Sequence, residues 1–207
     1  MRSPRGIAIA RHAVMTLRQK SEYKIFKTLW NKCVMPTPIV ELADDFGIEL
    51  IEYPFDHFGE ALACAHGKWT LGISQNDHPK IQRFSIAHGL GHYMLDRHNP
   101  KCHFDGRKMN WTAETRANAA AAELLLPEEL LREIIHLLDI RTLGINSLQK
   151  LSEHETDLRK LADDFKLSYT MLCWYLIDLK YITPEIACIF EQTANYSAVP
   201  EDDLLPF

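Results

Sequence analysis

The 207-residue sequence lacks several features that mark whole classes of protein. No apolar run approaches the roughly 18 residues needed to cross a bilayer. The basic N-terminus is not followed by the apolar segment and small-residue cleavage site of a secretory signal. The five cysteines are scattered and include no CxxC pair. We therefore expect free thiols, a cytoplasmic location and no membrane partner.

Charge is unevenly distributed along the chain. Residues 1–32 hold eight lysines and arginines against one acid, Glu22, so the rest of the chain is strongly acidic. A basic arm of this kind can bind nucleic acid or an acidic partner. The interpretation we favour is a solvated helix lying against the acidic body, with DNA contact indirect or weak.

The spacing of apolar residues, prolines and glycines predicts an α+β fold. Three strand-like runs cover 48–53, 60–66 and 69–74, and the HGK turn predicts a hairpin in a small antiparallel sheet. Gly47 is placed to end a short helix before the first strand, and Pro79 to begin a long helix after the last. Further helices are expected at 112–126, 128–138, 157–165, 169–180 and 184–194.

These elements suggest four parts to the chain. We expect a basic helical segment at residues 1–35, a domain that contains the strands at 36–140, a helical C-terminal domain at 141–195 and an acidic tail at 196–207.

The stretch RFSIAHGLGHYML, residues 83–95, places two histidines four residues apart. On a helix, His88 and His92 lie on one face, one turn apart, and could hold one zinc ion if a third ligand came from elsewhere. Glu114 is the preferred third ligand. Glu123 is the rival, but at nine residues from Glu114 it falls on roughly the opposite side of the helix. Asn118, one turn after Glu114, is a candidate to orient a ligand histidine.

The wider pattern resembles the ImmA/IrrE family of zinc metallopeptidases. The matching segments are PIVELADDFGIE, WTLGIS, the NDHP loop, QRFSIAHGLGHYML and ETRANAAAAELLLPEEL. The resemblance implies that residues 36–140 form a metallopeptidase-like domain of zincin-like fold, with zinc at His88, His92 and Glu114. It also implies a cytoplasmic regulator that acts on a helix-turn-helix repressor, in mobile elements, phage-like regions or stress responses.

The sequence departs from that family at Gly89, where the pattern has the glutamate that acts as general base. Because glycine can neither accept nor donate the proton, hydrolysis should be weakened by the ~10²–10⁴-fold that acid–base catalysis typically contributes. Without this carboxylate, a zinc site with one ligand glutamate keeps about one net positive charge, so an anionic occupant is expected. Glu60 and Tyr93 are the possible substitutes, but spacing supports neither. Gly89 also costs a helix interior ~1 kcal/mol, with no evident compensation.

Two other motifs have simpler explanations. The cluster HNPKCH, residues 98–103, is expected to be a polar loop rather than a second metal site. The helices at 157–180 resemble a helix-turn-helix in spacing, but the second has only Lys180 for phosphate, so we expect packing or partner binding. Its aromatic residues, Tyr169, Trp174 and Tyr175, are expected in the core.

Three functions are consistent with these patterns. The first is a zinc-site regulator of ImmA/IrrE type that acts on a repressor or antitoxin-like protein, with proteolysis weak or lost. The second is an active metallo-endopeptidase with a substitute base. The third is a DNA-binding regulator that uses the basic N-terminal segment.

Overall fold

The computed structural model of the chain describes residues 4–31, 35–54, 60–98, 110–142, 144–183 and 185–186. Within these ranges, no helix is long and apolar enough to cross a membrane. The chain divides into two compact units between Leu125 and Leu126. The predicted domain boundaries remain predictions. The HNPKCH cluster and the helix expected at 184–194 fall largely outside the described residues.

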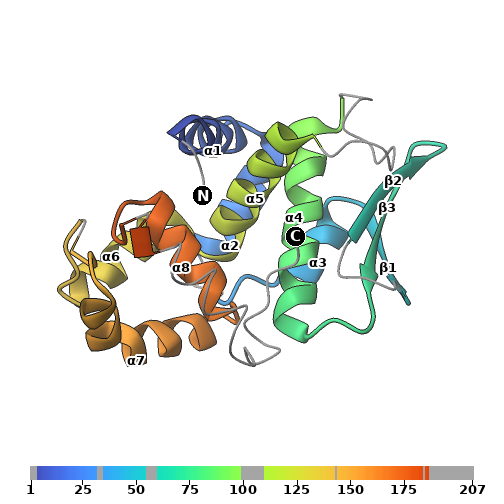
Figure 1. Cartoon of the computed structure of the whole chain (residues 1–207). Helices are drawn as coiled ribbons and strands as arrows, with labels where there is room; N and C mark the ends of the chain where they lie inside the picture. Colours follow the sequence, from blue (N-terminus) through green and yellow to red (C-terminus); the bar gives the residue numbers. More distant parts are fainter. Residues whose placement is uncertain are drawn as a thin grey trace. The chain divides into compact units, whose positions relative to one another are not determined.

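Along the described part of the chain the three strands follow one another, with helices before and after them, as Figure 1 labels them. In chain order they are α1 (Pro4–Leu17), α2 (Ser21–Asn31), α3 (Ile39–Asp45), β1 (Ile48–Tyr53), β2 (Glu60–Ala65), β3 (Lys68–Ser74), α4 (Pro79–Asp96), α5 (Trp111–Leu125), α6 (Glu128–Leu137), α7 (Leu148–Asp164) and α8 (Tyr169–Asp178). The fold is therefore α+β, as predicted.

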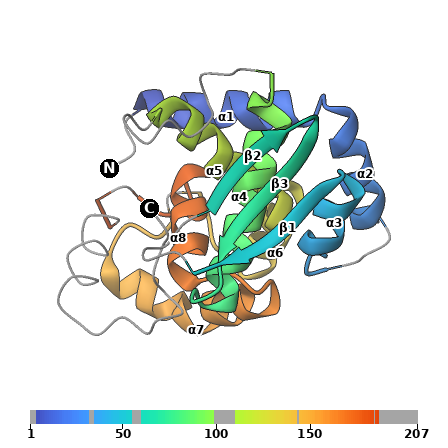
Figure 2. The ribbon, with the colours of Figure 1, turned by 90° about the vertical axis from the view of Figure 1, so that its right-hand side faces the viewer.

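The sheet has three strands in the order β1-β3-β2, which Figure 2 shows face on. The predicted hairpin is present, since β2 pairs antiparallel with β3 through a turn at His66 and Gly67, both at positive φ. The prediction of a wholly antiparallel sheet was wrong, because β1 pairs with β3 in parallel. Hydrophobic alternation predicts the strands but cannot tell which edge of β3 the first strand will occupy.

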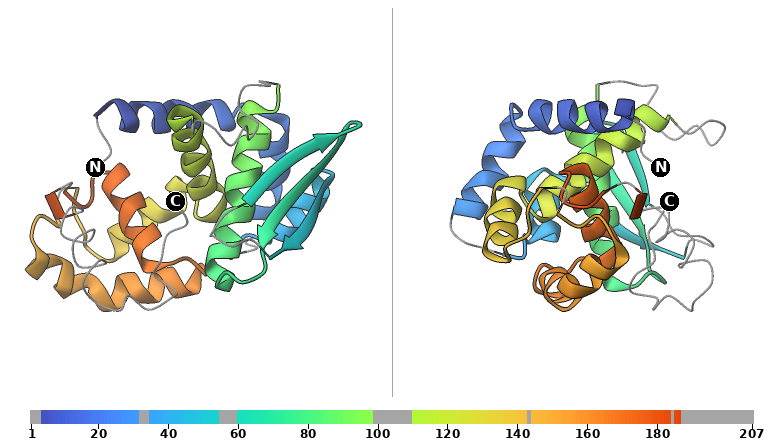
Figure 3. Two further views of the ribbon diagram at one scale, coloured as in Figure 1. Left: turned by 45° about the vertical axis from the view of Figure 1, so that its right-hand side comes forward. Right: turned by 60° about the vertical axis from the view of Figure 1, so that its left-hand side comes forward.

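Local sequence explains where the central helix begins. Pro79 occupies the first turn of α4, where an amide is not needed, and the His78 ring accepts a hydrogen bond from the Lys80 amide at 3.3 Å. From there α4 and α3 lie against one face of the sheet (Figure 3). The middle of α4 is buried on nearly every side, from Phe84 to Gly91.

Helices α4 and α5 pack at unusually short range. A Cβ atom at Gly91 would stand 2.8 Å from the Ala117 carbonyl oxygen and 3.0 Å from the Ala120 Cβ. The alanine run of α5 supplies the matching small surface, with Ala117, Ala120 and Ala121 fully buried. Gly91 therefore sets the separation of the two helices, because larger side chains would force their backbones apart.

The N-terminal helices pack against α5. Ala10 and Ala13 of α1 form a small apolar cluster with Ala119. Beside it, Arg18 donates to the Glu123 carboxylate at 2.8 Å, and the Tyr23 hydroxyl donates to the same oxygen at 2.7 Å. Glu123 is completely buried, so the two donors supply the partners that a buried charge requires.

The unit from Leu126 onward contains α6, α7 and α8. Helix α7 begins at Leu148, about nine residues before the predicted start, because Ser147 caps it by accepting from the Lys150 amide at 3.3 Å. Ser168 caps α8 in the same way, through the Met171 amide at 3.1 Å. Tyr169 and Tyr175 of α8 are buried, as expected for core residues, whereas Trp174 is only partly buried. The resemblance to a helix-turn-helix remains one of spacing.

The close approach at Gly91 predicts that Gly91→Ala destabilises the protein. Alanine favours a helix by ~1 kcal/mol over glycine. Overpacking against the Ala117 backbone should outweigh that gain at a cost of ~1–3 kcal/mol. Urea unfolding followed by circular dichroism should therefore show a lower free energy of unfolding than the wild type. A higher value would mean that α4 and α5 are free to separate without cost.

Candidate metal centre

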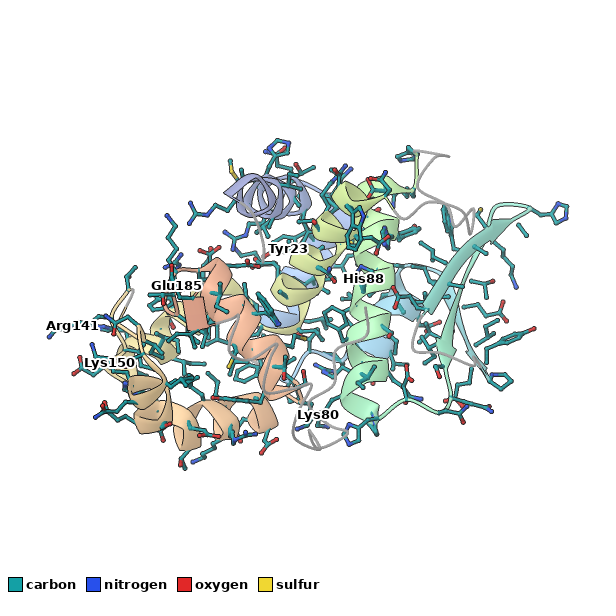
Figure 4. All side chains as sticks on the ribbon, in the orientation of Figure 1. Tyr23, Lys80, His88, Arg141, Lys150 and Glu185 are labelled. Carbon is teal, nitrogen blue, oxygen red and sulfur yellow. The ribbon has the colours of Figure 1, made fainter. Side chains whose placement is uncertain are left out.

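Three side chains on α4 and α5 converge on one point. His88 and His92 project from the same face of α4, with ring centroids 4.7 Å apart, and Glu114 faces them from the first turn of α5. The Glu114 oxygens lie 3.4 Å from His88 Nε2 and 3.5 Å from His92 Nε2. One ligand atom from each residue lies within 4.8 Å of the other two. Figure 4 labels His88 about midway along α4.

This set of donors fits a metal ion such as zinc. Two imidazole nitrogens and one carboxylate oxygen are the ligands that a catalytic zinc site takes from protein. His88 Nε2 is buried and has no hydrogen-bond partner among the described residues, although buried polar atoms are rarely left unpaired. The three residues could therefore hold a metal, as the sequence predicted. The Nε2 atom of each ring is the one that faces Glu114.

The electrostatic surroundings also favour a cation at this point. Burial alone would lower the pKa of His92, but contacts with Asp96 and Glu114 and the charge of Glu60 raise it to about 9. Burial would conversely raise the pKa of Glu114, and the two histidines outweigh that effect and lower it. Hence positive charge, whether a proton or a metal, is stabilised between the rings and the carboxylates.

Glu123, the rival third ligand, points away from this centre. Its carboxylate accepts from Arg18 and Tyr23 instead, on the side of α5 that the N-terminal helices cover. Their spacing of nine residues, at ~100° per residue, had predicted that Glu114 and Glu123 lie on opposite sides of the helix. Asn118 lies half-buried one turn beyond Glu114, and within the described part of the chain its side chain makes no hydrogen bond to either histidine. Its orienting role remains a prediction.

Two carboxylates lie beside the Nδ1 atoms of the two histidine rings, on the side away from Glu114. The His88 Nδ1 atom contacts the carboxylate of Glu60, the first residue of β2. Asp96 lies one turn after His92 on α4, with Oδ2 at 3.9 Å from His92 Nδ1, and its other oxygen pairs with Arg116 at 3.0 Å. The four-residue spacing of His92 and Asp96 was a visible signal for this second contact. No local spacing could have revealed Glu60, which comes from the sheet.

The space next to Gly89 is filled by the sheet. A Cβ atom at position 89 would stand 2.5 Å and 2.7 Å from the two terminal carbons of Leu71, on the central strand β3. Leu71 is completely buried, so its side chain has little freedom to turn aside. The missing side chain at position 89 therefore lets Leu71 reach the helix, a packing contact that the sequence alone did not reveal.

Glu60 also changes the expected charge of the site. A divalent cation with one ligand glutamate would carry about one net positive charge, but the neighbouring Glu60 offsets it, while Asp96 is already paired with Arg116. The site is about neutral when a divalent metal is bound. Net charge therefore does not favour an anionic occupant, although the sequence alone had suggested that it would.

Comparison with known proteins agrees with this geometry. The profile of the Peptidase_M78 family, described as the IrrE N-terminal-like domain, matches residues 43–176, well over half of the chain, and includes all three candidate ligands. The radiation response metalloprotease IrrE of Deinococcus radiodurans is 32% identical over 71 residues, which cover 30% of this chain and 21% of that protein. The chain thus aligns with about a fifth of the length of this relative. The extent of the profile match shows that the chain belongs to the ImmA/IrrE-type metallopeptidase family.

Proposed function

We propose that the protein is a zinc-binding regulator of ImmA/IrrE type in which peptide hydrolysis is weak or lost. The observation that carries this proposal is the contrast within α4. His88 and His92 meet Glu114 as a complete set of metal ligands, while the neighbouring position 89 has no side chain and is filled by Leu71.

His88, His92 and Glu114 would hold the zinc ion, and the metal would supply a Lewis acid to the site. Other residues of the same compact unit hold these ligands in place. Phe84 stacks on the His88 ring, with centroids 5.8 Å apart and planes inclined by 9°, and Gly91 keeps α5 close enough for Glu114 to reach both rings. None of these contacts depends on residue 89. Metal binding and hydrolysis are therefore separable in this chain.

The alternative of an active endopeptidase requires another base. Glu60 is the nearest described carboxylate to His88 that is not itself a proposed ligand, which favours it as the substitute. However, Glu60 contacts Nδ1, on the opposite side of the ring from the metal-facing Nε2. A base must lie within hydrogen-bond reach of the proton that it removes. Glu60 is better placed to hold His88 than to replace the missing glutamate.

We further propose that the partner is a helix-turn-helix repressor or antitoxin-like protein in the cytoplasm, bound rather than destroyed. This follows from family membership and from free cysteines such as Cys64 and Cys173, which suit a reducing compartment. The basic N-terminal segment gives less support to direct DNA binding, because Arg18 is already engaged by the buried Glu123. Any contact with DNA would then be indirect, through the repressor.

Metal analysis tests the first part of the proposal. Purified protein should contain about one zinc ion per chain, as expected for a single site of this kind. Glu114→Ala should lower zinc affinity by more than the ~10–100-fold that changes outside the ligand set cause. Glu123→Gln is the matched control on the same helix, and it should bind zinc like the wild type. Absence of zinc from the wild-type protein would exclude the metal site.

A cleavage assay tests the loss of hydrolysis. The zinc-loaded protein is incubated with the protein encoded by the neighbouring gene, as the candidate repressor, and the wild type should bind it without cutting it. Gly89→Glu alone should restore little, because the new side chain meets Leu71. The double variant Gly89→Glu/Leu71→Ala enlarges the side chain at position 89 and shortens the one at position 71, so that their summed volume changes little. It should cleave at least ~10²-fold faster than the wild type, the lower end of general-base contributions.

The controls separate packing from chemistry. Leu71→Ala alone should not cleave, and Gly89→Gln/Leu71→Ala should fill the same space without supplying a base. Rapid cleavage by the wild type would contradict the proposal and would favour an endopeptidase with a substitute base.

A further inference from the structure

The His88 ring is held from two directions by residues outside the ligand set. Its Nδ1 atom contacts Glu60 at the start of β2, and its face stacks on Phe84, one turn earlier on α4. Both side chains of the Glu60–His88 pair are largely buried, at 13% and 8% exposure. A charge-assisted hydrogen bond is strong when solvent is excluded in this way.

From this geometry we propose that Glu60 is a positioning residue for the metal centre, which fixes the orientation and the tautomer of His88. The inference rests on the proposed zinc site. When Nδ1 donates to a carboxylate, the proton of the neutral ring is placed there, and Nε2 keeps its lone pair. Nε2 is the atom that faces Glu114 at 3.4 Å, so the ring presents its unprotonated nitrogen to the metal.

The two histidines are not supported equally. Asp96 stands behind His92, but its Oδ2 lies 3.9 Å from Nδ1, beyond hydrogen-bonding distance, and its other oxygen is held by Arg116. Glu60 has direct contact with His88 and comes from a different element. Through this contact the edge strand β2 is linked to the metal-binding helix. Glu60 therefore matters more to the site than its distance from the HxxxH motif suggests.

The sheet provides a close control for this role. In the strand register, Glu52 on β1 and Glu60 on β2 are both paired with Ile73 of β3, from opposite sides. Glu52 is exposed and belongs to the other edge of the sheet. Replacing either glutamate removes one carboxylate from an equivalent position in the sheet, but only Glu60 touches a histidine.

The experiment measures zinc affinity of the full-length protein by competition with a chelator. Glu60→Ala should weaken zinc binding by ~10–100-fold, the range typical of carboxylates that support ligand histidines. Glu60→Gln, which can still accept a hydrogen bond but carries no charge, should lie between Glu60→Ala and the wild type. Glu52→Gln should match the wild type. Zinc affinity of Glu60→Ala within twofold of the wild type would overturn the inference.

A second measurement does not depend on metal. Nitrogen-15 NMR of the histidine rings in metal-free protein should report Nδ1–H for His88 in the wild type and in Glu52→Gln. The same signal should change towards a mixture of tautomers in Glu60→Ala. If the wild type bound no zinc, the proposed function would fail, and these spectra would still decide the role of Glu60. An unchanged His88 signal in Glu60→Ala would contradict it.

Discussion

The close packing of α4 against α5 is the constraint on which the metal centre depends. The two histidines belong to one helix and Glu114 to the next, so a ligand set forms only if the helix axes approach closely. Gly91 and the buried alanines of α5 permit that approach, because a Cβ atom at position 91 would press on the Ala117 carbonyl. A protein interior is too densely packed to absorb larger side chains there without moving a ligand.

The sheet adjusts the chemistry that this helix pair makes possible. Leu71 on β3 takes the space beside Gly89, and Glu60 on β2 brings a carboxylate to His88. Strand β3 thus fills the space beside position 89, where the family pattern has a glutamate. Strand β2 supplies a negative charge to a different side of the site. The scaffold of the metallopeptidase family is retained, and the two strands determine what surrounds the candidate ligand histidines.

The N-terminal helices contribute to the same arrangement from behind. Glu123 is buried on the far side of α5, where Arg18 and Tyr23 satisfy its carboxylate. Breaking such a buried pair on one side is costly, so the pair ties the basic segment to the helix that carries Glu114. The positive charge of Arg18, one of those in residues 1–32, therefore stabilises the packing of the N-terminal helices against α5.

The sequence alone determined the positions of most helices and strands and the candidate ligand set. Helical spacing put His88 and His92 on one face and separated Glu114 from Glu123, while Pro79 and Gly47 marked helix ends. These features depend on local periodicity, which neighbouring residues in the chain define. Only the tertiary structure decided that β1 joins β3 in parallel, that Leu71 fills the space at Gly89 and that Glu60 supports His88. Those contacts join residues far apart in the chain, and packing between elements sets them rather than any local pattern.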